Sequence, residues 1–315
     1  MADINYENIR LVLGEPNPGL RQSLKQALFT KGFRGIADCH DLAAVSDCLE
    51  ANACDVLICD IALSGDFCQL VHRLRHHRLG NNPFVLTIAT TDDASAAKIR
   101  QIIDSGVDDL LAKPVSLQQV LSRVDALARS RKPFVVTHDY IGPDRRKAMR
   151  EGERSAEQFE VPNPLRSKAL GGDSTSLQRT IENAALRLNI RKMERYAEQI
   201  GYLVDRVLAQ YEFGGNGYGG CAEDLDRLLY VGEDLSRRLR GTQFAFVGEM
   251  AMSLVSLVQR FRDPGFVPDN RDGELLTKLS DAIRRAFNLD QSAATATAAA
   301  VEEISGAVNR FAAEG

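Results

Sequence analysis

The feature that most constrains the fold of this chain is a repeating strand and helix pattern over its first 130 residues. Five short β-rich runs alternate with longer segments in which apolar residues recur at helical steps of three and four. The runs are Ile9–Leu13, Arg34–Cys39, Val56–Asp60, Phe84–Ala89 and Asp109–Ala112. Apolar strands that alternate with amphipathic helices build a parallel sheet covered on both faces. The pattern therefore predicts a doubly wound α/β domain.

Polar residues stand at the carboxyl ends of these runs, where ligands bind in open α/β sheets. Glu15 follows the first run, and Asp60 ends the third. Thr90 and Lys113 follow the fourth and the fifth. Two carboxylates, a hydroxyl and an ammonium are thus expected to converge at one edge of the sheet. Such a set can hold a hard cation such as Mg²⁺, supply a carboxylate nucleophile and contact a phosphoryl group.

Residues 8–130 resemble the receiver domain of two-component response regulators, which has a flavodoxin-like (βα)5 fold. The resemblance rests on the segment DVLICDIALSGD around Asp60, on SGVDDLLAKPVS around Lys113, and on the order and spacing of the polar residues. It implies that Asp60 is the phosphoacceptor. It further implies that Thr90 turns toward the aspartyl phosphate and that Lys113 contacts it.

The same resemblance implies a Mg²⁺ ion held by Glu15, Asp60 and the backbone carbonyl of Ala62. The second acid that usually follows the first strand is replaced by Pro16, with Asn17 as a weaker substitute. Because the affinity of such oxygen sites depends on ligand charge, we expect weaker Mg²⁺ binding. In addition, Leu110 stands where the family usually has an aromatic residue, so the usual coupling between that ring and the hydroxyl switch is not expected.

Residues 131–174 lose the periodicity and gain Pro, Gly, Ser and charge, which predicts a basic, partly disordered linker. Its one compact motif contains Arg145, Arg146 and Arg150. Guanidinium forks at such spacing can grip phosphates, and the motif is similar to the arginine motif of PilZ-type cyclic dinucleotide binders. A low-affinity anion site is therefore one interpretation. A solvated arm, or one that docks on the acidic receiver, is the other.

Helical periodicity returns over 175–315 and predicts an all-α bundle with helices over 177–211, 221–240, 244–262, 272–288 and 290–313. No histidine follows His138, so this region cannot be a histidine phosphocarrier. It holds 17 Lys and Arg against 20 Asp and Glu, a poor match to DNA. No nucleophile and base pair stands out, so we expect an interaction domain for a protein target or a second copy of the chain, and no enzyme.

The sequence as a whole indicates a cytoplasmic protein without a membrane span. No apolar run reaches the length of about 20 residues that a spanning helix needs, and the cysteines show no zinc-like spacing and are expected to be reduced. The leading hypothesis is a response regulator that a histidine kinase or phosphotransfer protein phosphorylates. The alternatives are a scaffold that works without phosphorylation and an adaptor that responds to a cyclic dinucleotide.

Overall fold

The computed structural model of the chain describes residues 5–146, 158–171, 173–212, 218–242, 244–263 and 268–287. They fall into two compact units, of which the first ends at Leu188 and the second begins at Asn189. The long helix α7 (Ser174–Glu212) contributes its beginning to the first unit and its remainder to the second. Each unit has its own hydrophobic core and is described separately.

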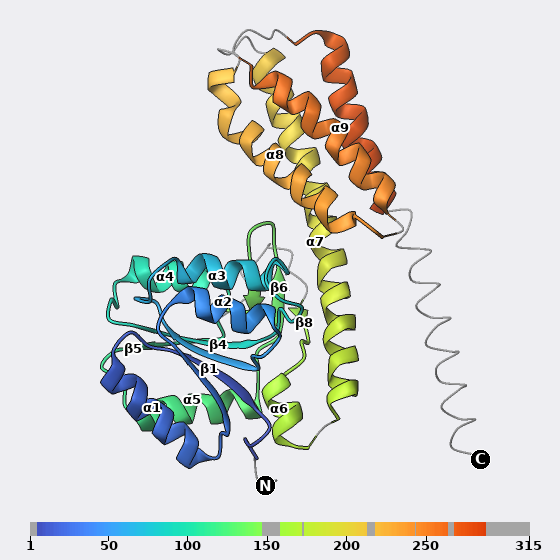
Figure 1. Cartoon of the computed structure of the whole chain (residues 1–315). Coiled ribbons are helices and arrows are strands. Elements are labelled where there is room, and N and C mark those ends of the chain that lie inside the picture. Colours follow the sequence, from blue (N-terminus) through green and yellow to red (C-terminus); the bar gives the residue numbers. More distant parts are fainter. Residues whose placement is uncertain are drawn as a thin grey trace, which may run out of the picture. The chain divides into compact units, whose positions relative to one another are not determined.

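A five-stranded parallel sheet with the order β2-β1-β3-β4-β5 forms the centre of the first unit (Figure 1). The strands are β1 (Arg10–Gly14), β2 (Gly35–Cys39), β3 (Val56–Asp60), β4 (Leu86–Thr91) and β5 (Asp109–Ala112). They coincide with the predicted runs to within two residues at each end and confirm the doubly wound, flavodoxin-like fold. The strand order reverses beside β1, which opens a crevice at the carboxyl ends of β1 and β3.

Helices cover both faces of this sheet, with α1 and α5 on one face and α2, α3 and α4 on the other (Figure 1). They are α1 (Pro18–Lys31), α2 (Leu42–Glu50), α3 (Phe67–Arg75), α4 (Ala96–Asp104) and α5 (Leu117–Arg129). Each begins after a side chain that accepts a hydrogen bond from a backbone N–H of the first turn, namely Asn17, Asp41, Asp66, Ser95 and Ser116. These caps fix where every helix starts and therefore the loops that carry the polar residues.

The segment after α5 differs from the predicted linker. A small antiparallel sheet of the order β7-β6-β8 is formed by β6 (Phe134–Val136), β7 (Ile141–Pro143) and β8 (Gln158–Phe159). It is followed by α6 (Pro164–Ala169), whose Leu165 is fully buried in the core beneath α1 and α5. Strands of two or three residues are too short to show a period in the sequence. The described part of the segment is thus packed on the first unit instead of forming a free arm.

The second unit consists of helices, as predicted. They are α7 from Asn189 onward, α8 (Tyr218–Leu239), α9 (Ala245–Phe261) and a helix over 270–287. All four contribute fully buried residues to one core, such as Val204, Leu228, Leu254 and Ile283. The predicted helix over 290–313 lies outside the described residues. Among the residues described, no helix combines the length and the apolar character that crossing a bilayer requires.

Candidate functional site

Four polar side chains meet at the carboxyl edge of the parallel sheet, where the sequence predicted them. Glu15 follows β1, Asp60 is the last residue of β3, Thr90 belongs to β4 and Lys113 follows β5. The β3–β4 register places Asp60 directly opposite Thr90. The carboxylates are almost completely buried, with 0% of the Asp60 side chain and 2% of the Glu15 side chain exposed, whereas Lys113 is 14% exposed. Lys113 is therefore the member of the group that reaches solvent.

Both oxygens of the Asp60 carboxylate accept hydrogen bonds. Oδ1 accepts one from the backbone N–H of Ala62 at 2.6 Å, and Oδ2 accepts one from the Thr90 hydroxyl at 3.1 Å. Lys113 forms an ion pair with the same Oδ2. A group attached to Oδ2 would therefore meet a hydroxyl and an ammonium at once, and these are the donors that a phosphoryl group needs.

Lys113 joins the two carboxylates, since its Nζ also lies 3.0 Å from Oε2 of Glu15. Partial burial disfavours the charged ammonium, but the hydrogen bonds with Asp60 and Glu15 outweigh it, so the pKa of Lys113 is raised above its ordinary value. Lys113 thus stays charged at neutral pH and compensates part of the negative charge of the site. The Lys113–Pro114 peptide bond is cis.

The loop after β1 holds Glu15 in place but offers no second acid. Oε1 of Glu15 accepts a hydrogen bond from the backbone N–H of Asn17 at 2.9 Å, and Arg21 donates to the backbone oxygen of Glu15 at 2.6 Å. The Asn17 side chain caps α1 by accepting from the backbone N–H of Leu20 at 3.0 Å. The Asn17 side chain is therefore engaged in capping α1. It does not replace the second acid, whose position Pro16 occupies.

The residues present fit a magnesium ion held by few protein ligands. Mg²⁺ keeps several waters and binds through one or two carboxylates together with phosphate oxygens. Glu15 and Asp60 supply two such carboxylates, and Ala62 belongs to the loop that follows Asp60. The structure, over the residues it describes, contains no group of three or more His, Cys, Asp and Glu side chains suited to a metal. A site with two acids agrees with the weaker binding expected from Pro16.

The arginine motif of the basic segment is engaged within the first unit. Arg145 donates to the backbone oxygens of Val107 and Asp108 at 2.6 and 2.8 Å. Arg146 faces Asp144 with two hydrogen bonds, from Nε at 2.9 Å and from Nη2 at 2.7 Å. Their guanidinium groups thus point at different partners within the first unit. Arg150, the third arginine of that prediction, lies outside the described residues.

A second buried carboxylate, at the opposite edge of the sheet, was not singled out by the sequence. Asp108 precedes β5 and pairs with Arg75 at 2.9 Å and with Arg131 at 2.8 Å. The exposed fractions of these side chains are 1% for Asp108, 0% for Arg75 and 3% for Arg131. Both guanidinium groups also stack over the ring of Phe134 in β6, at 5.2 and 4.7 Å from its centroid. We call Asp108, Arg75 and Arg131 the Asp108 cluster.

The charged side chains of the Asp108 cluster stabilise one another in their ionised forms, although all three are buried. Burial disfavours the ionised carboxylate, but Arg131 and Arg75 outweigh it and keep the pKa of Asp108 below its ordinary value. Burial lowers the pKa of Arg75 to about 10, which still leaves it charged at neutral pH. Arg75 also donates to the backbone oxygens of Pro83, Val85 and Gly106. Through these contacts the cluster connects β6 and the start of β5 with the end of α3.

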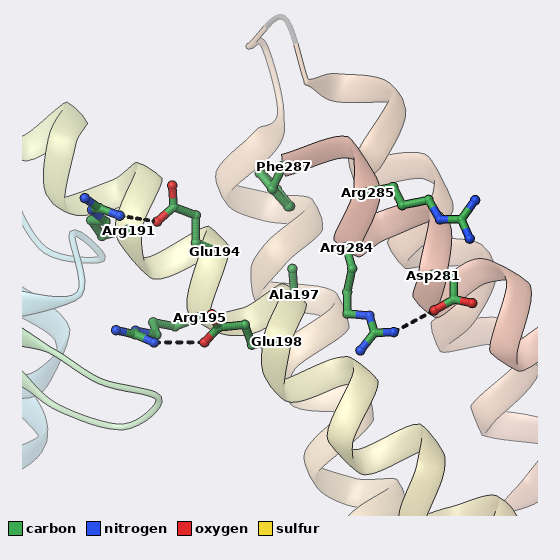
Figure 2. Close-up of a pocket in the computed structure, with 9 residues that line it drawn as sticks. All are labelled: Arg191, Glu194, Arg195, Ala197, Glu198, Asp281, Arg284, Arg285 and Phe287. Carbon is green, nitrogen blue, oxygen red and sulfur yellow. Dashed lines mark hydrogen bonds and ion pairs between the residues drawn. The ribbon is translucent and has the colours of Figure 1, made fainter. Parts of the chain in front are cut away.

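The second unit carries a groove of about 580 Å³ between α7 and the helix over 270–287 (Figure 2). Its lining contains four arginines and three acids: Arg191, Arg195, Arg284, Arg285, Glu194, Glu198 and Asp281. Figure 2 shows that three of the arginines pair with an acid of their own helix and that Arg285 points away from Arg191. The cations do not converge on one point, so this groove is not an anion site.

Comparison with known proteins assigns part of the chain. The sequence profile of the response regulator receiver domain matches residues 12–125. The chain is 27% identical over 127 residues to the response regulator MprA of Mycobacterium tuberculosis, a match that covers 40% of this chain and 53% of MprA. It is 30% identical over 134 residues to the transcriptional activator protein PfeR of Pseudomonas aeruginosa, covering 41% of this chain and 42% of PfeR. The chain spans about half the length of the curated relatives it matches.

Among solved structures, the chain is similar to the signal receiver domain of NarL from Mycobacterium tuberculosis, with a TM-score of 0.36 and 22% identity. That likeness covers 40% of this chain and 99% of the NarL chain. The profile match ends at residue 125 and so does not reach the second unit. Residues 12–125 of this chain are a response regulator receiver domain of the two-component systems.

Proposed function

We propose that Asp60 accepts a phosphoryl group from a histidine kinase or a phosphotransfer protein. An oxygen of the carboxylate attacks the phosphorus, a P–O bond forms, and the P–N bond to the donor imidazole breaks with its electron pair left on nitrogen. The observation that carries this proposal is the shared contact of Thr90 and Lys113 with Oδ2 of Asp60. The same donors that now hold the carboxylate would hold the phosphoryl oxygens after transfer.

Each residue of the site has a part in this transfer. Lys113 stays charged and can exchange its contact with the carboxylate for one with the phosphoryl group. Thr90 donates to the oxygen that Asp60 presents. Glu15 and Asp60 would hold a Mg²⁺ ion, which supplies positive charge for the transferred oxygens. We infer weak Mg²⁺ affinity, because Pro16 stands where a further acid of this set would be.

We further propose that phosphorylation alters contacts of the second unit with a protein target, and that this unit has no enzymatic activity. An acyl phosphate carries about two negative charges where the carboxylate carried one, and this change beside β4 and β5 can reorder the surface that these strands support. The second unit is a helical bundle with no histidine, and its acidic excess favours protein over DNA as the partner.

A beryllofluoride titration tests the first proposal. The full chain is titrated with beryllofluoride at rising Mg²⁺ concentration, and the backbone N–H signals of Thr90 and Lys113 are followed by NMR. We expect saturable shifts that require Mg²⁺ and vanish in Asp60→Asn. Asp66→Asn is the matched control, because it removes the same charge from an exposed cap of α3 close to the site. Equal shifts in Asp60→Asn and the parent would contradict phosphoryl transfer to Asp60.

One observation favours a second candidate, a receiver that docks its partner without phosphorylation. Lys113 already pairs with both carboxylates, so the site is partly neutralised before any transfer. A pull-down of binding partners with the full chain separates the two functions. Loss or gain of a partner in Asp60→Asn supports the phosphoswitch, whereas identical partners with and without phosphodonor support the constitutive scaffold.

A further inference from the structure

A cavity of about 320 Å³ lies in the first unit, at the amino edge of the parallel sheet. Residues at or before the starts of β1, β3 and β4 line it, together with α6 and the first turns of α7. Asp60 and Lys113 stand at the carboxyl edge of the same sheet, so this cavity is separate from the phosphoacceptor site. Small-molecule sites have volumes of about 300–1,000 Å³, and the cavity can therefore hold a small organic molecule.

Two cations and one carboxylate determine the charge of this cavity. Asp55 precedes β3 and is buried, with 3% of its side chain exposed. Lys168 of α6 donates to both carboxylate oxygens of Asp55, at 2.9 and 2.7 Å. Arg10 of β1 reaches the same two oxygens only at 3.4 Å, from Nε and from Nη2. Because Lys168 alone balances the charge of Asp55, Arg10 gives the cavity one positive charge in excess.

The guanidinium of Arg10 is placed to bind a second anion. Its side chain is 48% exposed, and its contacts with Asp55 are longer than the usual range of about 2.7–3.2 Å for N–H···O hydrogen bonds. The planar fork of an arginine matches the two oxygens of a carboxylate. A carboxylate also fits the single excess charge better than a phosphate monoester, which carries about two negative charges at neutral pH.

The remaining lining of the cavity adds hydrogen-bond donors and apolar surface. The side-chain oxygens of Asn52 and Asn82 accept from backbone N–H groups of the loop before β4, both at 2.9 Å. Since these oxygens are engaged by the backbone, each amide can offer its NH₂ group to a ligand. Leu177 and Ile181 of α7, both buried, supply the apolar surface. A ligand that fits this lining carries a hydrogen-bond acceptor and a short alkyl chain.

We propose that this cavity is a binding site for a small monocarboxylic acid that carries a hydrogen-bond acceptor and a short alkyl chain. The carboxylate pairs with the guanidinium of Arg10. The acceptor takes a hydrogen bond from the amide of Asn52 or Asn82, and the alkyl chain packs on Leu177 and Ile181. Binding makes and breaks no covalent bond, and it does not involve Asp60.

An NMR titration of the ¹⁵N-labelled full chain tests the site, with 3-methyl-2-oxobutanoate as the probe. We expect saturable shifts of the backbone signals of Arg10, Asn82 and Ile181, with half-saturation at about 1 mM or below, as for a ligand this small. The ketone 3-methylbutan-2-one has the same alkyl and keto groups without the carboxylate and should leave these signals unchanged. Inorganic phosphate at the same concentration should also leave them unchanged.

A variant of the arginine separates binding in the cavity from a general effect of charge. Arg10→Gln removes the guanidinium but keeps the buried Asp55 paired with Lys168, and it should raise the half-saturation concentration about tenfold or more. Arg123→Gln is the matched control. Arg123 is 52% exposed and lies 3.5 Å from its acid, close to the 48% and 3.4 Å of Arg10, but it does not line the cavity. This variant should bind the probe as the parent does.

The titration of the parent decides the question without any variant that must fold. An absence of saturable shifts, or equal shifts with the ketone, would overturn the proposal. Phosphate that binds as tightly as the probe would overturn the carboxylate as the ligand class. Shifts confined to Thr90 and Lys113 would place the acid at the phosphoacceptor site and overturn the cavity as the site. Asp60→Asn should bind the probe as the parent does, so the outcome is independent of whether Asp60 is phosphorylated.

Discussion

Asp60 and Asp108 are both buried carboxylates at ends of strands, yet they occupy opposite edges of the same sheet and differ in their partners. Asp60 faces one lysine, 14% exposed, and one hydroxyl. Asp108 faces two arginines, 0% and 3% exposed, which also stack on Phe134. Lysine is a point charge on a flexible stem, whereas the arginine fork is held by several hydrogen bonds at once.

This difference separates the proposed phosphoacceptor from a carboxylate that holds structural elements together. One partner of Asp60, the ammonium of Lys113, reaches solvent, and the proposed phosphoryl group would take over its contact with the carboxylate. The partners of Asp108 are fixed by backbone oxygens and an aromatic ring, so nothing can enter without breaking the packing. A carboxylate at a strand end is therefore informative only together with the identity and the exposure of its cations.

The largest effect should come from breaking the Asp108 cluster. Asp108→Asn leaves Arg75 and Arg131 buried without a counter charge, which costs about 3–5 kcal/mol. We expect that loss in the free energy of unfolding of the first unit, measured by urea denaturation. Asp109→Asn is the control, because its pair with Arg123 is half exposed and should be worth no more than about 1 kcal/mol. Equal losses of unfolding free energy in both variants would show that the buried Asp108 cluster contributes no more to stability than the exposed pair of Asp109 and Arg123.

The pH dependence should follow from the lowered pKa of Asp108. A carboxyl group whose pKa is lower in the folded state stabilises the fold at pH values above its unfolded pKa of about 3.9. That contribution is lost as the pH falls from there through the folded pKa. The difference in urea midpoint between the parent and Asp108→Asn should therefore be constant near neutral pH and shrink below about pH 4. A difference that grows on acidification would refute this assignment.

A smaller loss in the free energy of unfolding is expected when Arg145 is replaced. This residue connects the segment after α5 with the start of β5. Arg145→Leu removes two hydrogen bonds to the backbone oxygens of Val107 and Asp108 and should cost about 1–2 kcal/mol. Thermal unfolding measures this loss. Calorimetric titration of the parent with a cyclic dinucleotide should give no heat of binding. Saturable heat that disappears in Arg145→Leu would instead support an anion site at this arginine.

The smallest effect should occur in the groove of the second unit. Arg195 and Glu198 are a pair at i,i+3 with side chains 38% and 62% exposed. Glu198→Gln should change the free energy of unfolding by less than about 0.5 kcal/mol. A loss several times larger in urea denaturation would mean that the exposed pairs around the groove act as a coupled network.

The sequence was sufficient for the parts of the fold that repeat. The five strands and the residues at their ends follow from hydrophobic period and from the geometry of parallel sheets, so Asp60 and Lys113 could be placed together before the structure was known. The helices of the second unit were found for the same reason, since they are long and periodic.

Other features depend on contacts that no period reveals. Strands β6 to β8 have only two or three residues each, so their backbone pairing leaves little trace in the sequence. The Asp108 cluster joins α3, the start of β5 and the chain after α5, and Asp108 reads as an ordinary turn residue until these are brought together.

The most direct test of the central claim is to locate the phosphoryl group itself. The full chain is incubated with acetyl phosphate and Mg²⁺, the intact mass is measured, and the acyl phosphate is reduced with borohydride and mapped by peptide sequencing. We predict a gain of about 80 Da that maps to Asp60 and is absent in Asp60→Asn. No gain in mass, or the same gain in Asp60→Asn, would contradict the assignment of Asp60 as the phosphoacceptor.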